Sequence, residues 1–175
     1  GARTMVTQRN ATERGQVQRA RDDVIAERQS PDRDSPGHVD RDVAALDRAV
    51  GRLARFGDRV GILPADLTSA ADRKRICDQA AAWRGGVNVL INNAGINHFR
   101  MFEDQPPEQL DLALAINVQA PIHLCQGMLP QLRRQPEACI LNTGSVFGAI
   151  GYPGYAVYSA TKFAVRGFTE ALRRE

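Results

Sequence analysis

Two residues near the carboxyl end of the chain, Tyr158 and Lys162, combine a phenol and an ammonium at a spacing that suits proton transfer. On a helix, residues four apart lie on the same face, so the two side chains can meet. A phenol held beside an ammonium should lose its proton more readily than a free tyrosine does. Lysine is also scarce, since Lys74 is the only other one among the 23 basic residues. The pair is therefore a candidate proton donor and acceptor near neutral pH.

The spacing of Tyr158 and Lys162 also has a purely structural explanation, without proton transfer. A tyrosine that begins a helix and a lysine on its solvated face would produce the same pattern. Taken alone, a pattern this short favours the structural explanation. The elements that surround Tyr158 and Lys162 must therefore decide between the two.

The composition is that of a soluble globular domain. The 175 residues suit one domain, and 43% of them are hydrophobic and 25% charged. The net charge of +3 is not gathered into a basic face, which argues against a nucleic-acid partner. Cys77, Cys125 and Cys139 are far apart and lack a C-x-x-C spacing, so neither a disulfide framework nor a metal site is expected. No apolar run reaches the roughly 18 residues of a membrane span, and no signal peptide is evident, so we expect a cytoplasmic protein with no membrane partner.

The chain changes character near residue 40. Residues 1–39 are polar and rich in Arg, Asp and Gln, and residues 30–37 have the composition of a loop. We predict that residues 1–39 are a separate segment, either disordered or non-native. From residue 40 the apolar residues recur at regular spacings, so we predict a globular domain over residues 40–175.

Helices and strands are predicted to alternate along this domain. The periodicity and the positions of Gly and Pro predict helices over 43–53, 70–83, 107–134 and 156–175 and strands over 59–63, 87–91 and 138–142. The third helix is expected to be one long helix or two, interrupted at Pro121. Strands that alternate with long helices predict an α/β fold with a doubly wound parallel sheet.

Polar clusters follow the predicted strands at the points where the strands end. Asp66 follows the first strand, residues 92–95 follow the second, and residues 143–145 follow the third. Tyr158 lies in the helix after the third strand. Ligands of doubly wound sheets bind beyond the carboxyl ends of the strands. This shared location favours a functional site over the structural explanation of the Tyr158 and Lys162 spacing.

Four short motifs occur in a fixed order along the chain. They are Asn92-Asn93-Ala94-Gly95, Ile116-Asn117-Val118, Asn142-Thr143-Gly144-Ser145 and Tyr158-Ser159-Ala160-Thr161-Lys162. Over roughly three quarters of its length, the chain therefore resembles the short-chain dehydrogenase/reductase family. The resemblance implies an incomplete Rossmann-like domain of an NAD(P)-dependent oxidoreductase, which interconverts a carbonyl and a secondary alcohol.

The resemblance implies a role for each of four catalytic residues. Tyr158 would exchange a proton with the substrate oxygen, while Lys162 would assist its ionisation and bind the nicotinamide ribose. Ser145 would hold the substrate oxygen as its charge develops. Asn117 would position a water that links Lys162 to solvent.

The resemblance also implies cofactor contacts and a substrate pocket. The cofactor residues would be Asp40, Arg41, Asp66, Leu67, Asn93, Ala94, Gly95, Tyr158 and Lys162. Asp40 would favour NAD by bonding the adenosine ribose, whereas Arg41 would favour NADP by pairing with a 2′-phosphate, so either cofactor fits. An apolar, partly aromatic pocket for a small-molecule carbonyl or alcohol would be lined by Ile96, Phe99, Phe147, Tyr152 and Tyr155.

Several of these residues have a structural alternative. Asn117 lies in an apolar helical run, where its amide could bond a neighbouring backbone, and Ser145 could cap a helix or turn. Asn93 and Gly95 could shape the turn after a strand. Asp66 could be the N-cap of the helix that follows it.

Two features of the family are missing from the sequence. The glycine-rich turn Thr-Gly-x-x-x-Gly-x-Gly, which holds a cofactor pyrophosphate, does not occur in residues 1–39, and residue 175 lies within the helix of Tyr158. A second hypothesis is therefore a truncated, catalytically inactive relative that acts, if folded, as an assembly partner. Because subunits of the family pair through the long helices, here 107–134 and 158–175, a homo-oligomer is expected.

Overall fold

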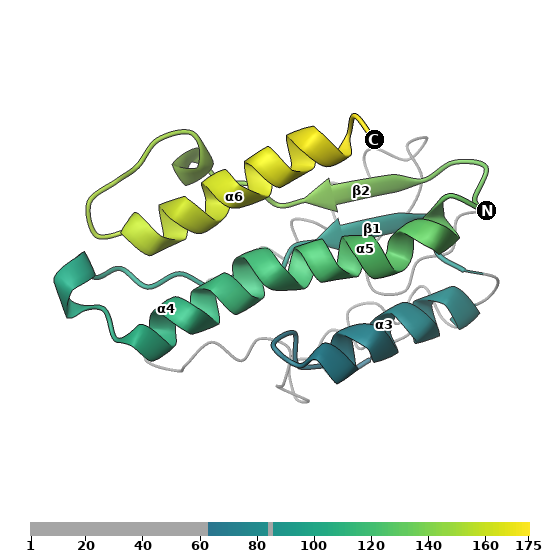
Figure 1. The fold of residues 1–175 in the computed structure, drawn as a ribbon, viewed down its shortest axis with the longest axis horizontal. Helices are drawn as coiled ribbons and strands as arrows, with labels where there is room; N and C mark the ends of the chain where they lie inside the picture. Colours follow the sequence, from purple (N-terminus) through teal and green to yellow (C-terminus); the bar gives the residue numbers. More distant parts are fainter. Residues whose placement is uncertain (1–62, 84–85) are drawn as a thin grey trace, which may run out of the picture.

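The structure is a computed structural model, and it describes residues 63–83 and 86–175 (Figure 1). The predicted helix over 43–53 and the predicted strand over 59–63, apart from its last residue, lie outside the described residues. So do the predicted segment 1–39 and the candidate cofactor residues Asp40 and Arg41. The predicted domain boundaries therefore stay a prediction.

Two parallel strands form the sheet of the described residues. β1 (Val89–Asn92) pairs with β2 (Cys139–Asn142) in a register that aligns the first residues of the strands and also their last residues. Bonds from Cys139 N to Asn88 O and from Thr143 N to Asn92 O extend the pairing by one residue at each end. Parallel neighbours need a long crossover, which the helices between residues 107 and 132 provide. The predicted strands 87–91 and 138–142 are thus confirmed to within two residues.

The crossover is one continuous helical segment with an irregular turn in its middle. It consists of α4 (Pro107–Leu114), the π-helical turn η6 (Ala115–Gln119) and α5 (Ala120–Leu132). Pro121 has no N–H and cannot give the carbonyl of Asn117 its α-helical bond. The helix widens instead, because Ala120 N bonds the carbonyl of Ala115, five residues back. The predicted interruption at Pro121 is thus a π turn just before the proline.

The remaining helices pack around this segment. α3 (Ala70–Ala82) lies beside α5, and α6 (Ala156–Leu172) packs against α4 and η6 (Figure 1). Short 3-10 turns, η5 (Phe102–Asp104) and η7 (Val146–Gly148), lie in the loops after the two strands. One buried cluster consists of Ala80, Val87, Met128 and Leu132. A second consists of Ile96, Ala113 and Val157.

The segment Pro107–Leu132 is long and apolar enough, by length and composition alone, to cross a membrane. This is weak evidence, because the core helix of a soluble protein passes the same test. Here the segment contacts α3, both strands and α6. The apolar window of this segment is 39% buried, and the segment packs on the sheet and on two helices in the described part of the chain.

Amide side chains from the crossover hold the chain on both sides of β1. Gln131, on α5, accepts a bond from Val87 N at 3.2 Å and donates to Val87 O. Asn117, on η6, makes the same pair of bonds with the main chain of Ile96. Gly86 has φ +96° beside the Gln131 amide, and an added Cβ would lie 2.3 Å from Gln131 Oε1. A glycine is therefore required at position 86, directly before the contact between Val87 and Gln131.

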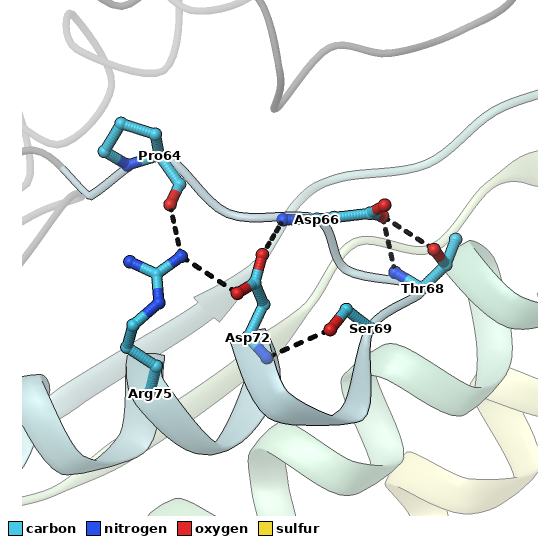
Figure 2. A network of polar contacts seen from close by, with 6 residues as sticks. All are labelled: Pro64, Asp66, Thr68, Ser69, Asp72 and Arg75. Atoms are coloured by element: carbon cyan, nitrogen blue, oxygen red, sulfur yellow. Dashed lines mark hydrogen bonds and ion pairs between the residues drawn. The ribbon is translucent and has the colours of Figure 1, made fainter.

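The start of α3 is held by a polar network (Figure 2). Ser69 is the N-cap, and its hydroxyl accepts a bond from Asp72 N at 3.2 Å. Asp72 in turn accepts from Asp66 N at 2.7 Å and from Arg75 at 3.0 Å. Asp66 instead accepts bonds from the amide and the hydroxyl of Thr68. The structural alternative for Asp66 was therefore wrong: it forms a turn before the helix, because Ser69 lies where the helix begins.

We expect Asp72→Asn to lower stability at neutral pH and to remove part of its acid dependence. The hydrogen bond from Asp66 N is the largest cause that lowers the pKa of the Asp72 carboxyl, and the bond from the Arg75 guanidinium lowers this pKa further. Because the pKa is lower in the folded state, the Asp72 carboxylate stabilises the fold at pH values above its unfolded pKa of about 4. This stabilisation is lost as the pH falls through the pKa of the folded state. Urea unfolding at pH 7 and at several values below 4 measures this. The difference from the wild type should shrink in acid. Asp111→Asn, on the exposed surface of α4, is the control, and equal pH profiles for wild type and Asp72→Asn would contradict the assignment.

Candidate active site

Tyr158 and Lys162 lie together in the first half of α6, as their spacing predicts. The Lys162 ammonium is 5.6 Å from the centroid of the Tyr158 ring. Lys162 is only 5% exposed, and its Nζ donates to the main-chain oxygen of Thr143 at 2.8 Å. The carbonyl that follows β2 therefore fixes the ammonium beside the phenol. The structure thus brings together the two groups that the sequence predicts as a proton donor and acceptor.

Asn117 is buried beneath this pair, with 2% of its surface exposed. Its Oδ1 accepts from Ile96 N at 2.8 Å. Its Nδ2 donates to Ile96 O at 2.8 Å and to Thr161 Oγ1 at 3.1 Å. An amide nitrogen has two protons, so both are engaged within the protein. The backbone bonding considered as an alternative is therefore present, and only the oxygens of Asn117 can bind a water.

Ser145 stands at the end of the loop after β2, where it begins η7. Its Oγ accepts a bond from Phe147 N at 3.2 Å, so the capping alternative is present too. This bond uses a lone pair of the hydroxyl and leaves the proton available for donation. Capping and contact with a substrate oxygen are therefore compatible at Ser145.

Asn93 and Gly95 shape the loop after β1 close to the Lys162 ammonium. The Thr143 hydroxyl donates to Asn93 Oδ1 at 3.1 Å, which joins the loops that follow the two strands. A Cβ added at Gly95 would lie 3.3 Å from Asn117 Oδ1 and 3.7 Å from Lys162 Nζ. The glycine thus keeps open the space beside two candidate catalytic groups. Ala94, between Asn93 and Gly95, is half-buried.

Asp66 belongs to the network at the start of α3 (Figure 2), and Leu67 follows it in the chain. The carbonyl of Leu67 accepts a bond from the buried Arg73 side chain at 2.6 Å. The structure thus gives both residues a structural role, and their predicted contact with a cofactor stays a prediction.

A group of aromatic rings adjoins Tyr158. The Phe147 ring lies 4.9 Å from Tyr155 and 6.1 Å from Tyr158, edge-on to the latter. Phe99 lies 5.1 Å from Tyr155, and Tyr152 stacks on Phe147 at 5.7 Å. Four of the five residues predicted to line a pocket are therefore brought together.

Ile96 is the exception. It is 8% exposed and packs in the core against Ala113 and Val157. The prediction was wrong for Ile96, whose main chain is held by Asn117 while its side chain fills the core.

Gly154 makes room for this aromatic group. It has φ +79°, its carbonyl accepts a bond from Arg100 N at 3.0 Å, and an added Cβ would lie 2.4 Å from the Phe99 ring. The loop after β1 therefore rests directly on the loop that leads into α6.

Sequence reasoning did not assign functions to three residues that support this site. Thr143 holds both Lys162 and Asn93, and Thr161 bonds Asn117. Gly148 approaches α6 so closely that an added Cβ would lie 2.9 Å from the main-chain oxygen of Lys162. Thr143 and Thr161 lie within the quoted motifs, but the chain's local pattern carried no signal for their partners.

We expect Gly148→Ala to destabilise the protein by about 1 to 3 kcal/mol, since the methyl group would meet backbone that cannot turn away. Gly167→Ala is the matched control. It lies within α6 with open space around the added Cβ, and should stabilise the protein by about 0.5 to 1 kcal/mol. Urea unfolding of both variants gives the two values. Equal stabilities would show that η7 and α6 do not pack this closely.

Comparisons with known proteins agree with this fold. The family model described as short chain dehydrogenase matches residues 36–175. The chain is 34% identical over 131 residues to a D-beta-hydroxybutyrate dehydrogenase of Cupriavidus necator, covering 74% of this chain and 51% of that protein. The chain spans about half the length of the curated relatives that it matches.

Solved structures agree as well. A short chain dehydrogenase/reductase from Burkholderia phymatum in complex with NAD has a TM-score of 0.71 at 31% identity, over 75% of this chain and 47% of that one. A metagenomic short-chain oxidoreductase in complex with NADP has a TM-score of 0.70 at 25% identity, over 75% and 60%.

Fold and site thus define an α/β protein of the Rossmann-like class, with polar residues at the carboxyl ends of parallel strands. The predicted fold class is confirmed. The chain belongs to the short-chain dehydrogenase/reductase family.

Proposed function

We propose that the chain carries the proton-transfer site of an NAD(P)-dependent oxidoreductase that interconverts a carbonyl and a secondary alcohol. The observation that carries the proposal is the buried Lys162 ammonium, which Thr143 holds beside the Tyr158 ring. Family membership supports it, as do the dehydrogenase named among the relatives and the neighbours solved with NAD and with NADP.

The residues around Lys162 fit a nicotinamide cofactor. Gly95 leaves space beside the ammonium that a Cβ would occupy. When bound, the cofactor supplies or accepts the hydride. We assign Asn93, Ala94, Gly95, Tyr158 and Lys162 to its nicotinamide half, and Asp66 and Leu67 to its adenosine half. The choice between NAD and NADP stays open, because Asp40 and Arg41 lie outside the described residues.

Tyr158 gives its hydroxyl proton to the substrate oxygen during reduction and takes a proton back during oxidation. Ser145 donates a hydrogen bond to the same oxygen, which stabilises negative charge as it develops. Lys162 keeps a positive charge beside the Tyr158 ring and binds the nicotinamide ribose.

Asn117 completes the proposed site through its oxygens. Since both protons of its amide are engaged, a water that exchanges protons with Lys162 is held by Asn117 Oδ1 or by its main-chain carbonyl. Pro121 cannot occupy that carbonyl with an α-helical bond. The π turn thus leaves this carbonyl without an α-helical bond, and we assign it to the proposed water site.

The partners of the proposed enzyme follow from the same features. The exposed Phe99 and Tyr152 rings near Tyr158 support a small-molecule carbonyl or alcohol substrate with apolar bulk. The free thiols of Cys77, Cys125 and Cys139 fit the reducing, cytoplasmic setting that we propose. Assembly into a homo-oligomer through the long helices is part of the proposal.

Titration of the purified protein with NADH and with NADPH, followed by nicotinamide fluorescence, tests the proposal. We expect saturable binding of at least one of them and turnover of a carbonyl substrate. If neither binds at millimolar concentration, the enzyme assignment fails for this chain, and an inactive assembly partner becomes the better description.

A further inference from the structure

Thr161 is the most deeply buried polar residue near the site, with an exposed fraction of 0%. Its hydroxyl donates to the main-chain oxygen of Tyr158 at 2.7 Å and accepts from Asn117 Nδ2 at 3.1 Å. One side chain thus joins the π turn of the crossover to the first turn of α6. It is the last residue before Lys162.

The direction of these bonds is determined throughout. Ile96 N can only donate, so it selects Asn117 Oδ1 as its acceptor. The Asn117 nitrogen must then face Thr161, and it can only donate. Thr161 therefore accepts with its oxygen, and its single proton goes to the carbonyl of Tyr158. A hydroxyl is the group that can accept from Asn117 and donate to Tyr158 at the same time.

Thr161 is the link between the first turn of α6 and the π turn. The helix begins at Ala156, and its N-cap residue, Tyr155, makes no side-chain capping bond. Tyr158 is the third residue of the helix, in a turn whose N–H groups have no partners within the helix. The bond from Thr161 goes to the carbonyl of Tyr158, three residues back in the same helix, and Thr161 joins this turn to the buried Asn117.

We propose that Thr161 is a positioning residue, whose hydroxyl holds Tyr158 in register with Asn117 and Lys162. This inference rests on the proposed function, in which Tyr158 exchanges the proton. Small displacements of a reacting group lower the rate of its reaction steeply. Loss of the hydroxyl should therefore act on turnover more than on cofactor binding.

The same helix offers a matched control at Thr169. Its hydroxyl donates to the main-chain oxygen of Val165 at 2.7 Å and accepts from Asn142 Nδ2 at 2.9 Å. Thr169→Val thus removes the same pair of bonds as Thr161→Val, two helical turns away from Thr161. Any difference between the variants comes from what each threonine holds.

The experiment compares Thr161→Val, Thr161→Ser and Thr169→Val with the wild type. We expect Thr161→Val to lower kcat by about 10- to 100-fold and to change cofactor affinity by less than about twofold. Thr161→Ser keeps the hydroxyl and should recover most of the lost turnover, and Thr169→Val should retain the wild-type rate. A serine variant as slow as the valine variant overturns the inference. Equal losses in Thr161→Val and Thr169→Val overturn it too.

A second readout does not depend on activity. With ¹³C-labelled tyrosine, the protein gives ring signals from three tyrosines, and Tyr158→Phe assigns the signal of interest. We expect Thr161→Val to shift the Tyr158 signal, whereas Thr161→Ser and Thr169→Val leave it in place. An unshifted signal overturns the inference. If the wild type shows no turnover, the proposed function fails while this readout still decides the positioning role.

If Thr161→Val does not fold, Thr161→Ala and Thr161→Ser replace that comparison. They differ by one oxygen atom, so the same two readouts apply. Equal kcat values and equal Tyr158 signals in the alanine and serine variants overturn the inference.

Discussion

Tyr158→Phe is expected to lower kcat by about 10²- to 10⁴-fold while cofactor affinity stays within about twofold of the wild type. Phenylalanine keeps the ring, and with it the contacts to Phe147 and Tyr155. Only the hydroxyl that we propose to exchange the proton is lost. Steady-state turnover and nicotinamide fluorescence titration measure the two quantities separately.

Tyr155→Phe is the comparison for this variant, since it removes the same hydroxyl from a ring 6.2 Å from that of Tyr158. Its kcat should fall far less than that of Tyr158→Phe. If Tyr158→Phe turned over at the wild-type rate, proton exchange would have to occur at another group.

Asn117→Leu is expected to lower the free energy of unfolding by about 3 kcal/mol or more. Leucine has a similar size, but it leaves the N–H and the carbonyl of Ile96 without the partners they have in the buried site. Each buried polar group that loses its partner costs about 1 to 3 kcal/mol. Urea unfolding followed by circular dichroism gives the value.

Gln119→Leu provides the control, because Gln119 lies in the same π turn with an exposed side chain. Surface substitutions of this kind change stability by about 0.5 kcal/mol or less. Similar unfolding midpoints for the two variants would show that the Asn117 amide does not hold the loop after β1. Asn117→Leu should also lower turnover, since Thr161 and the carbonyl of Tyr158 lose their link to that loop.

Most of the described fold could be predicted from local sequence patterns. Residues such as Val89, Leu90 and Ile91 mark a buried strand wherever the chain places them, and helical periodicity placed α3 and α6 to within three residues. Pro121 predicted an irregularity in the crossover helix, but the sequence did not indicate whether the helix would break or widen there. That outcome depends on what packs around the turn.

The candidate site also contains contacts that the sequence could predict and contacts that it could not. Tyr158 and Lys162 could be paired from the sequence because residues four apart on one helix are neighbours in any tertiary fold. The partners of Asn117 could not, since Ile96 is 21 residues away and Thr161 is 44 residues away. The position of Ile96 was misjudged for this reason: a residue next to a polar loop faces the core or a pocket according to which helix covers it.

The sequence by itself thus determined the order of the described strands and helices, the family, and the shared helix face of Tyr158 and Lys162. Only the tertiary structure decided what holds these two residues in place. The ammonium of Lys162 donates a hydrogen bond to the carbonyl of Thr143. The carbonyl of Tyr158 accepts a bond from Thr161, which in turn accepts a bond from Asn117. Local sequence patterns do not predict such bonds. These hydrogen bonds join segments that meet only when the strands pair and the crossover packs against α6.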